Sequence, residues 1–269
     1  MGLRDIEPKP KGWASTYGAW FDEESVATRY SFRPPYPAET FELLDSLAAD
    51  SPRNVLDAGC GPGDLARRLA PLVDRVDAVD RSRAMLVAGR TLPGAAAANL
   101  NWIRAAIEDA PLDPPYSLIV AGDSVHWFDW APTMKIFSDA LSPHGVLALV
   151  TRDWISDSSL RARLGAIYSR HGANPDFAAL DPVEELARRG LFEQLGQRAT
   201  GREPWSPTRA ELIGCHHSQN GFVLEKMRDA AAFDRELVAA VEELVPVSED
   251  RFDLGVVATI TWGLPHAPG

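Results

Sequence analysis

The chain has 269 residues, a formal net charge of −11 at pH 7, 45% hydrophobic residues and 24% charged residues. This composition is that of a folded protein with a sizeable core, and the negative charge would repel a nucleic-acid backbone, so nucleic acid is not expected as a partner. No stretch approaches the roughly 20 apolar residues of a membrane span, and Cys60 and Cys215 show no metal-ligand spacing, so we expect a cytoplasmic protein with no membrane contact, bound metal or disulfide framework.

The N-terminal part predicts helices that are joined by a rigid elbow. Residues 1–12 are charged and interrupted by prolines, which indicates a loose lead-in. From Tyr17 to Ser46 apolar residues recur at helical spacing, except at residues 33–37, where prolines remove hydrogen-bond donors and favour an extended turn. We assign residues 1–46 to a lead-in and lid helices.

From Asn54 the pattern changes to strands that alternate with helices. Strands are expected at residues 55–57, 75–79, 100–104, 117–121 and 145–151, and helices at 65–69, 82–89 and 131–140. This alternation predicts a parallel, doubly wound sheet. We assign residues 47–154 to a Rossmann-like core.

After Trp154 the alternation stops. Helical segments are expected at residues 181–189 and within 208–244, and strands at 192–200 and 255–262. We assign residues 155–269 to a helical cap and the last strands of the sheet, packed with the core as one unit. The predicted fold is α/β: a Rossmann-like, doubly wound, mostly parallel seven-stranded sheet with helical N-terminal and cap elements.

A glycine-rich turn follows the first predicted strand. The sequence from Asp57 to Gly63, DAGCGPG, leads from a β-branched strand into a helix, which is the context of a ligand-binding turn. Gly59 and Gly61 would let the backbone approach a ligand closely. Asp64 stands where a dinucleotide site has its third glycine, which disfavours NAD. Asp57 would repel a pyrophosphate and attract a positive group, although it could instead merely cap the next helix.

A second acidic residue supports this site. Asp80 ends the second predicted strand about 20 residues after the turn, where a carboxylate can accept hydrogen bonds from ribose hydroxyls. The segments VLDAGCGPG (55–63) and DAVDRSRAML (77–86) together resemble the class I S-adenosylmethionine (SAM)-dependent methyltransferases. The resemblance implies that Asp80 binds the ribose of S-adenosyl-L-methionine, with Arg81 beside it, and that Met85 packs on the adenine. Core packing is the alternative for Met85.

The segment AIEDAPL (106–112) is similar to the part of these enzymes that contacts the edge of the adenine. This similarity implies that Ile107 and Glu108 belong to the cofactor site. Ala110 stands where the family usually has leucine, and a solvated loop is the alternative for Glu108 and Asp109.

Residues 121–130 combine aromatic and polar side chains at the end of the fourth predicted strand, an edge that faces the ligand in an open parallel sheet. We expect Asp123 in the cofactor site. Trp127 could offer its ring to a sulfonium or a cationic substrate, and His126 could accept a proton near neutral pH. Core packing and a helix start at Asp129 are the alternative.

The segment YSFRPPYP (30–37), the His126-Trp127 pair and PWSPTRAEL (204–212) resemble the small-molecule branch of trans-aconitate-type and related type-11 methyltransferases. This implies that the N-terminal helices fold over the cofactor and that Tyr30 and Arg33 lie near its methionyl carboxylate. A guanidinium pairs bidentately with a carboxylate. Stabilisation of the proline elbow is the alternative role for Arg33.

In the cap, Trp154, His216 and His217 are predicted to contact the acceptor. Because adjacent residues of a helix point in different directions, we expect one histidine to face the pocket and the other to face solvent. No further ligands stand at metal-binding spacing. Further candidates for the pocket are Arg152, Tyr168, His171, Arg202 and Trp262.

These observations predict a SAM-dependent methyltransferase that methylates an oxygen, nitrogen or carbon atom of a small molecule. His126 would act as the base for a hydroxyl or amine acceptor, whereas a carboxylate needs none. The alternatives are a SAM-binding enzyme of secondary metabolism with a non-methylating step, and a catalytically silent SAM-binding partner protein. A dehydrogenase is least favoured, and we expect a monomer or a homodimer.

Overall fold

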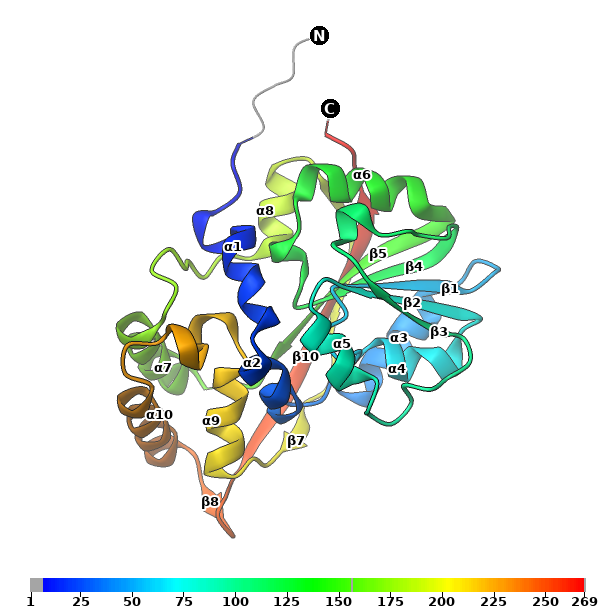
Figure 1. Cartoon of the computed structure of the whole chain (residues 1–269). Helices are drawn as coiled ribbons and strands as arrows, with labels where there is room; N and C mark the ends of the chain where they lie inside the picture. Colours follow the sequence, from blue (N-terminus) through cyan, green and yellow to red (C-terminus); the bar gives the residue numbers. More distant parts are fainter. Residues whose placement is uncertain (1–6, 156, 269) are drawn as a thin grey trace.

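A twisted sheet forms the centre of the computed structural model, which describes residues 7–155 and 157–268 (Figure 1). Its main path has the order β3-β2-β1-β4-β5-β10-β6, and β7 pairs with β10. The first five strands of this path are parallel, and β10 runs antiparallel to β5 and β6. The strands are β1 (Asn54–Ala58), β2 (Arg75–Asp80), β3 (Leu100–Arg104), β4 (Tyr116–Gly122), β5 (Leu141–Asp153), β6 (Phe192–Ala199), β7 (Glu203–Trp205) and β10 (Leu254–Pro265).

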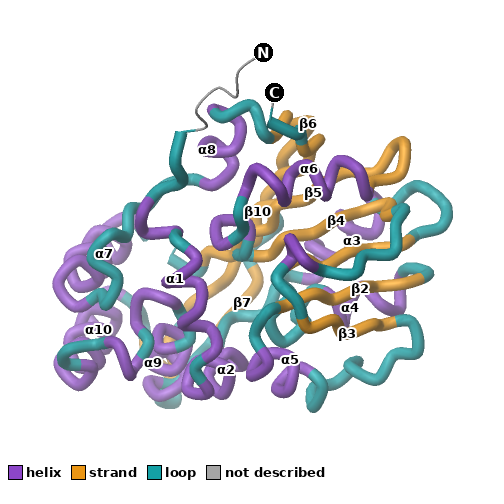
Figure 2. Tube along the Cα trace, turned by 45° about the horizontal axis from the view of Figure 1, so that its top comes forward, coloured by secondary structure: helices purple, strands orange, loops and turns teal. Residues whose placement is uncertain are grey.

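Helices cover both faces of this sheet, as the layers in Figure 2 show. Because successive side chains of a strand point to opposite faces, Val55 of β1 belongs to one core and Leu56 to the other. Val55 shares its core with α3 (Ala38–Leu47), α4 (Ala66–Leu69) and α5 (Arg83–Gly89). Leu56 shares its core with α6 (Trp130–Ala140) and α8 (Pro182–Arg188).

A third core holds the cap together. It joins α7 (Ser158–His171), α9 (Arg209–His217) and α10 (Ala230–Leu244) through residues such as Leu164, Leu212 and Phe233. Thr208 and Glu211 form a reciprocal capping box that fixes the start of α9. The short helices α1 (Ser15–Gly18) and α2 (Glu24–Arg29) lie between the cap and the sheet (Figure 1).

The predicted mostly parallel, doubly wound sheet is confirmed, with its seven strands on the main path. The addition is β7, which is too short to give an alternating pattern, together with a separate hairpin of β8 (Val247–Ser248) and β9 (Arg251–Phe252). Residues 1–6 of the expected lead-in lie outside the described residues, whereas Lys11–Trp13 forms a 3₁₀ turn with a buried Trp13. Within the described part of the chain, no helix is long and apolar enough to cross a membrane.

Candidate functional site

The glycine turn lies between β1 and α4, at the carboxyl edge of the sheet. Gly59, Gly61 and Gly63 have φ values of +67°, +56° and +77°, a region that L side chains rarely adopt. A Cβ atom at Gly59 would stand 2.7 Å from the Cβ of Ser124, and one at Gly63 would stand 2.4 Å from the Trp102 ring. The turn therefore needs glycine for its backbone conformation and for its packing.

Asp80, at the end of β2, organises this turn. One carboxylate oxygen accepts a hydrogen bond from the Gly61 N–H at 2.7 Å, and the other accepts one from the Ser82 N–H at 2.7 Å. Burial raises the pKa of Asp80, and these two hydrogen bonds partly oppose the effect. Since each carboxylate oxygen has a second lone pair, Asp80 can accept two further hydrogen bonds, as a ribose requires.

Asp57 lies beneath the turn and is 1% exposed. Its carboxylate accepts a hydrogen bond from the Ala66 N–H at 2.9 Å, at the first residue of α4. Burial raises the pKa of Asp57 to about 7. The structure thus shows the helix-capping contact that was the alternative for this residue.

A cavity of about 320 Å³ opens above the turn. Its wall brings together ten of the eleven residues predicted for the cofactor, and Asp57 is the exception. These ten are Tyr30, Arg33, Gly59, Gly61, Asp80, Arg81, Met85, Ile107, Glu108 and Asp123.

Part of the wall of this cavity is formed by the apolar side chains of Met85 and Ile107. Met85 is 1% exposed and packs against Val26 and Ala27 of α2, so it contributes both to a core and to the cavity wall. Ile107 is 4% exposed. Glu108 accepts hydrogen bonds from the Asp129 N–H at 2.7 Å and the Thr133 hydroxyl at 3.2 Å, which ties this segment to the start of α6.

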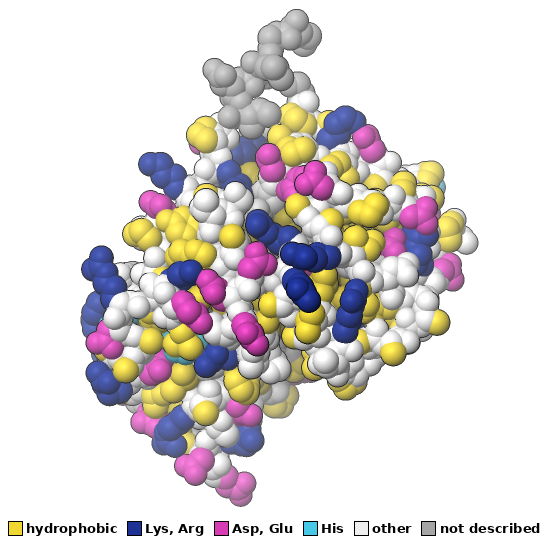
Figure 3. Space-filling model, viewed as in Figure 1, with side chains coloured by type: hydrophobic (Ala, Val, Ile, Leu, Met, Phe, Trp, Pro, Cys, Tyr) yellow, Lys and Arg dark blue, Asp and Glu magenta, His cyan; other side chains and the backbone are white. Residues whose placement is uncertain are grey.

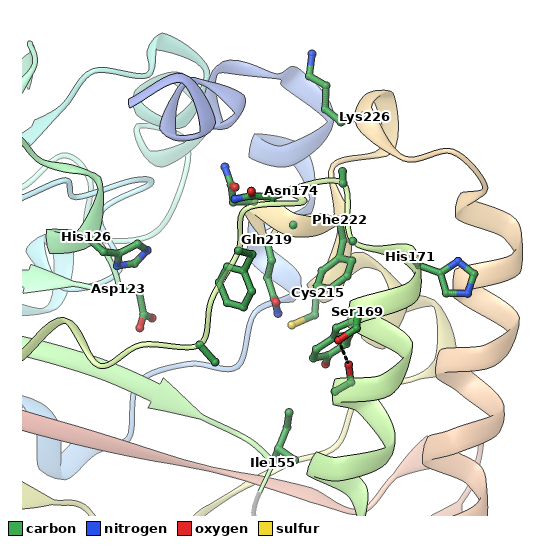
Figure 4. A pocket seen from close by; sticks show the side chains of 18 of the residues that line it. Asp123, His126, Ile155, Ser169, His171, Asn174, Cys215, Gln219, Phe222 and Lys226 are labelled. Carbon is green, nitrogen blue, oxygen red and sulfur yellow. Dashed lines mark hydrogen bonds between the residues drawn. The ribbon is translucent and has the colours of Figure 1, made fainter. Parts of the chain in front are cut away.

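A second, larger cavity of about 1110 Å³ lies between the sheet edge and the cap (Figure 4). The two cavities share four wall residues, namely Phe21, Arg33, Asp123 and Trp127. A molecule in one cavity would therefore contact a molecule in the other at this junction.

Arg33 connects the N-terminal elbow to the cap. Its guanidinium donates to the Ser218 hydroxyl at 2.9 Å, to the Ser218 carbonyl at 2.6 Å and to the Tyr30 hydroxyl at 3.1 Å. The guanidinium carbon also lies 4.0 Å from the centre of the Tyr30 ring. All of these partners are neutral, so the positive charge of Arg33 is not cancelled by a protein carboxylate through these contacts.

Asp123 follows β4 with a φ of +50°, a conformation that costs a non-glycine residue about 1 kcal/mol or more. Its carboxylate accepts from Arg152 Nε at 3.2 Å and from the Tyr36 hydroxyl at 3.4 Å. Arg152, whose side chain is 5% exposed, also pairs with Asp64 at 3.3 Å and donates to the Pro34 carbonyl at 2.9 Å. One arginine therefore joins β5, the glycine turn and the elbow.

His126 and Trp127 stand on a 3₁₀ turn next to the junction. The centre of the His126 ring lies 4.6 Å from the centre of the Trp127 ring and 5.6 Å from the centre of the Trp13 ring. Burial lowers the pKa of His126 to about 4, so the imidazole is neutral near pH 7. In Figure 4 its ring points into the larger cavity, next to Asp123.

The expected arrangement of the two cap histidines is wrong. His216 and His217 are 0% and 2% exposed, and neither lines one of the two cavities. His216 bonds the Leu212 carbonyl and the Tyr168 hydroxyl, both at 2.8 Å, and His217 lies 2.8 Å from Asp234. The tight packing of α9 against α7 and α10 buries both rings, which the sequence of α9 alone does not reveal.

Other residues of the same region do reach the larger cavity. Cys215 and Gln219 line it from the end of α9, and Figure 4 shows them beside Phe222 and across from Asp123. Trp154, which was predicted to contact the acceptor, also lines this cavity and packs edge-on against Trp205 at 5.4 Å.

Comparison with known proteins identifies the core. Residues 55–145, which run from β1 into β5, match the family model of a methyltransferase domain. This part of the chain is similar to a methyltransferase domain. This match confirms the resemblance carried by the glycine turn and Asp80, and it supports SAM as the cofactor.

Curated relatives match beyond this domain. The chain is 29% identical over 181 residues to a trans-aconitate 2-methyltransferase of Yersinia pestis, an alignment that covers 65% of the chain and spans 58% of the length of that relative. It is 31% identical over 163 residues to a malonyl-[acyl-carrier protein] O-methyltransferase of Enterobacter lignolyticus, with 57% of the chain and 63% of that protein covered.

A solved structure from Anaeromyxobacter dehalogenans, described as a type II methyltransferase, has a TM-score of 0.60 and 24% identity and covers 87% of this chain and 99% of its own. A methyltransferase structure from Bacillus halodurans has a TM-score of 0.52 and 17% identity, with 85% of this chain and 100% of its own covered. At these identities the two structures show a shared fold.

The residues of the methyltransferase domain fit SAM. The turn leaves the backbone of Gly59 and Gly61 at the cavity wall, and Asp80 has acceptor capacity left for two hydroxyl groups. Met85 and Ile107 provide apolar side chains to the wall of the same cavity.

The sequence predictions missed two residues that shape the junction. Phe21 lines both cavities, yet its helical spacing looks like that of an ordinary core residue. Ser218 holds two of the Arg33 hydrogen bonds from 185 positions away in the chain, and no local pattern marks it. Of the further pocket candidates, Arg152, Tyr168 and His171 line the larger cavity.

Proposed function

We propose that the protein transfers the methyl group of SAM to a small organic acceptor. The smaller cavity would hold the cofactor, and the larger cavity would hold the acceptor. The observation that carries this proposal is the shared wall of Phe21, Arg33, Asp123 and Trp127, because in-line transfer requires the two molecules to meet at one point.

Asp80 would accept hydrogen bonds from the ribose, and Arg33 would pair its uncompensated charge with the methionyl carboxylate. The Met85 and Ile107 side chains would contact the adenine. When bound, SAM supplies an electrophilic methyl group on a sulfonium, which an acceptor nucleophile can attack in line.

His126 is the proposed catalytic residue. Burial lowers its pKa to about 4, which leaves the imidazole neutral near pH 7 but makes it a weak base, so a ring nitrogen would accept the proton as the hydroxyl or amine gains the methyl group and becomes acidic. Asp123 and Trp127 lie at the same junction, where a carboxylate and an aromatic face would stabilise a developing or existing positive charge.

The rest of the proposal follows from charge and composition. Acidic and basic side chains both occur on the face shown in Figure 3, where several Lys and Arg side chains gather near the middle, and the net charge of −11 favours a small-molecule acceptor over nucleic acid. The two curated relatives are named for small or carrier-bound carboxylic acids. We further propose a cytoplasmic monomer or homodimer.

The test is calorimetric titration with SAM, S-adenosylhomocysteine (SAH) and NAD. We expect selective binding of SAM and SAH, and we expect Asp80→Ala to weaken SAM binding about 100-fold because two hydrogen bonds and the order of the turn are lost. Asp139→Ala is the matched control, since its carboxylate is exposed on α6 and pairs with Lys135. Preferential NAD binding, or equal SAM affinity in Asp80→Ala, would overturn the proposal.

A further inference from the structure

Aromatic rings are the bulkiest apolar groups of the larger cavity wall, where they stand among charged and polar side chains. Six of them come from separate parts of the chain, and in Figure 4 the Phe222 ring lies on the cap side, opposite Asp123 and His126. Flat apolar rings favour a flat apolar ligand, because they bury its faces and exclude water. The six are Trp13, Phe21, Trp127, Trp154, Tyr168 and Phe222.

Most of the charged side chains of this wall have partners, whereas Arg228, which is exposed to solvent, has no ion pair among the described residues. Arg152 faces two carboxylates, those of Asp64 at 3.3 Å and Asp123 at 3.2 Å, so it has no excess positive charge to offer. Arg33 keeps its charge, but under the proposed function that charge serves the carboxylate of the cofactor. The other wall residues in ion pairs are Asp153 with Arg161, Arg170 with Glu236, and Lys226 with Glu23.

A polycarboxylate would fit this wall poorly. Burying a carboxylate without a cation of its own costs several kcal/mol, and a second or third carboxylate would multiply that cost. The volume of about 1110 Å³ also exceeds the roughly 300–1,000 Å³ of most ligand cavities, which suits several fused rings better than a short acid.

We propose that the acceptor is an uncharged polycyclic compound with a hydroxyl group, held between these rings with the hydroxyl at Asp123 and His126. This assignment rests on the proposed function. The O–CH₃ bond would form as the S–CH₃ bond of SAM breaks, the hydroxyl proton would pass to a ring nitrogen of His126, and SAH would leave. The amide of Gln219 faces the same space and can bond a second oxygen of the acceptor.

The test compares two ligands of one shape and a different charge. 2-Hydroxyanthracene and anthracene-2-carboxylate are titrated by their fluorescence into the full chain, with and without SAH, and trans-aconitate is titrated by calorimetry. We expect the hydroxyl compound to bind at least tenfold more tightly than the carboxylate, and trans-aconitate to bind more weakly than either. Equal or tighter binding of either acid would overturn the inference.

This comparison distinguishes a wrong substrate class from a wrong proposed function. If the chain binds SAH but prefers the acids, the substrate class is wrong and the proposed methyl transfer stands. If it prefers 2-hydroxyanthracene but binds neither SAM nor SAH, the character of the cavity is supported and the proposed function is wrong.

A pair of variants ties the binding to this cavity. Gly165 lines it from α7, and an added Cβ there meets nothing within 4 Å, so the backbone position has room for a side chain and Gly165→Leu would reduce the space in the cavity. We expect at least tenfold weaker binding of 2-hydroxyanthracene and an SAH affinity within twofold of the original. Ala166→Leu, at the next, exposed position of α7, should change neither. Unchanged hydroxyanthracene binding in Gly165→Leu would place the ligand elsewhere and overturn the assignment.

Discussion

The two cavities that meet at Trp127 are built in different ways. The smaller one is formed mainly by the carboxyl ends of the parallel strands and the turns that follow them, as with Gly61 after β1 and Asp80 at the end of β2. The larger one is formed by side chains from the N-terminal turns, from α7 and from the end of α9. The smaller cavity is therefore shaped mainly by the sheet, whereas the larger cavity forms only where the cap packs against the sheet.

This difference has a physical consequence. The strand ends are held by sheet hydrogen bonds and by two cores, so the shape of the smaller cavity is tied to the stability of the whole domain. The larger cavity depends on the third core and on single contacts such as that between Arg33 and Ser218. Substitutions near the smaller cavity should therefore change the stability of the whole domain, and substitutions near the larger cavity should change how the cap packs.

The largest effect is expected at the glycine turn. Gly63→Ala would force a side chain into a φ of +77° and into the Trp102 ring, at 2.4 Å. Left-handed strain and overpacking together should lower the free energy of unfolding by about 3 kcal/mol. Urea denaturation at pH 7 would measure the loss.

Gly190→Ala is the matched control. Gly190 has a φ of +70° after α8, but a Cβ there meets nothing within 4 Å. Only the backbone strain should act in this variant, and it should lower the free energy of unfolding by about 1 kcal/mol. Equal losses in the two variants would mean that contact with Trp102 adds nothing to the requirement for glycine.

The sequence predicted the smaller cavity well because its parts are local. The turn from Asp57 to Gly63 and the acid that ends the next strand stand at spacings set by one strand–helix–strand unit. Parallel pairing of β1 with β2 then brings them together without further information. Asp57 shows the limit of this reasoning, because the same motif leaves open whether its carboxylate faces the cavity or the first turn of α4.

The larger cavity was predicted less well because its parts meet only through tertiary packing. The aromatic rings were visible in the sequence, but the partners of Arg152 come from β4, the glycine turn and the elbow. The sequence suggests that His216 and His217 line a pocket, but in the structure α10 packs against α9 and both side chains are buried. Helical spacing separates their directions but cannot tell which neighbours bury each of them.

An effect of similar size is expected in the cap, but it depends on pH. Burial lowers the pKa of His216 to about 4, compared with 6.5 in the unfolded chain. Below pH 6.5 the unfolded state gains a proton that the folded state does not, so stability is lost as the pH falls from 6.5 towards 4. This contribution is about 3 kcal/mol over that range.

His216→Gln should remove this contribution, because an amide does not titrate. Urea denaturation at pH 7 and pH 4.5 would show a smaller loss of stability than in the original protein. His266→Gln, at a half-exposed position near the C-terminal end, should leave the loss unchanged. The same loss in His216→Gln and in the original protein would assign the pH dependence to other groups.

The smallest effect is expected where the two regions meet. Arg33→Lys keeps the charge but replaces a planar group that donates to Ser218 and Tyr30 by a single ammonium. We expect SAM affinity to fall about tenfold, since the elbow would no longer be held against α9 in the geometry that pairs with a carboxylate. Arg29→Lys, on α2 with a contact to the Ser25 carbonyl, is the control and should stay within twofold.

Two thermal measurements on Arg33→Lys separate the roles of this residue. The unfolding midpoint without ligand reports the connection between the elbow and the cap, and the increase caused by SAM reports the contact with the cofactor. A lower midpoint with an unchanged SAM-induced increase would make Arg33 a structural link alone. An unchanged midpoint with a smaller increase would show that the cofactor, rather than Ser218, is the partner that fixes this arginine, and that the two cavities are coupled through the bound ligand.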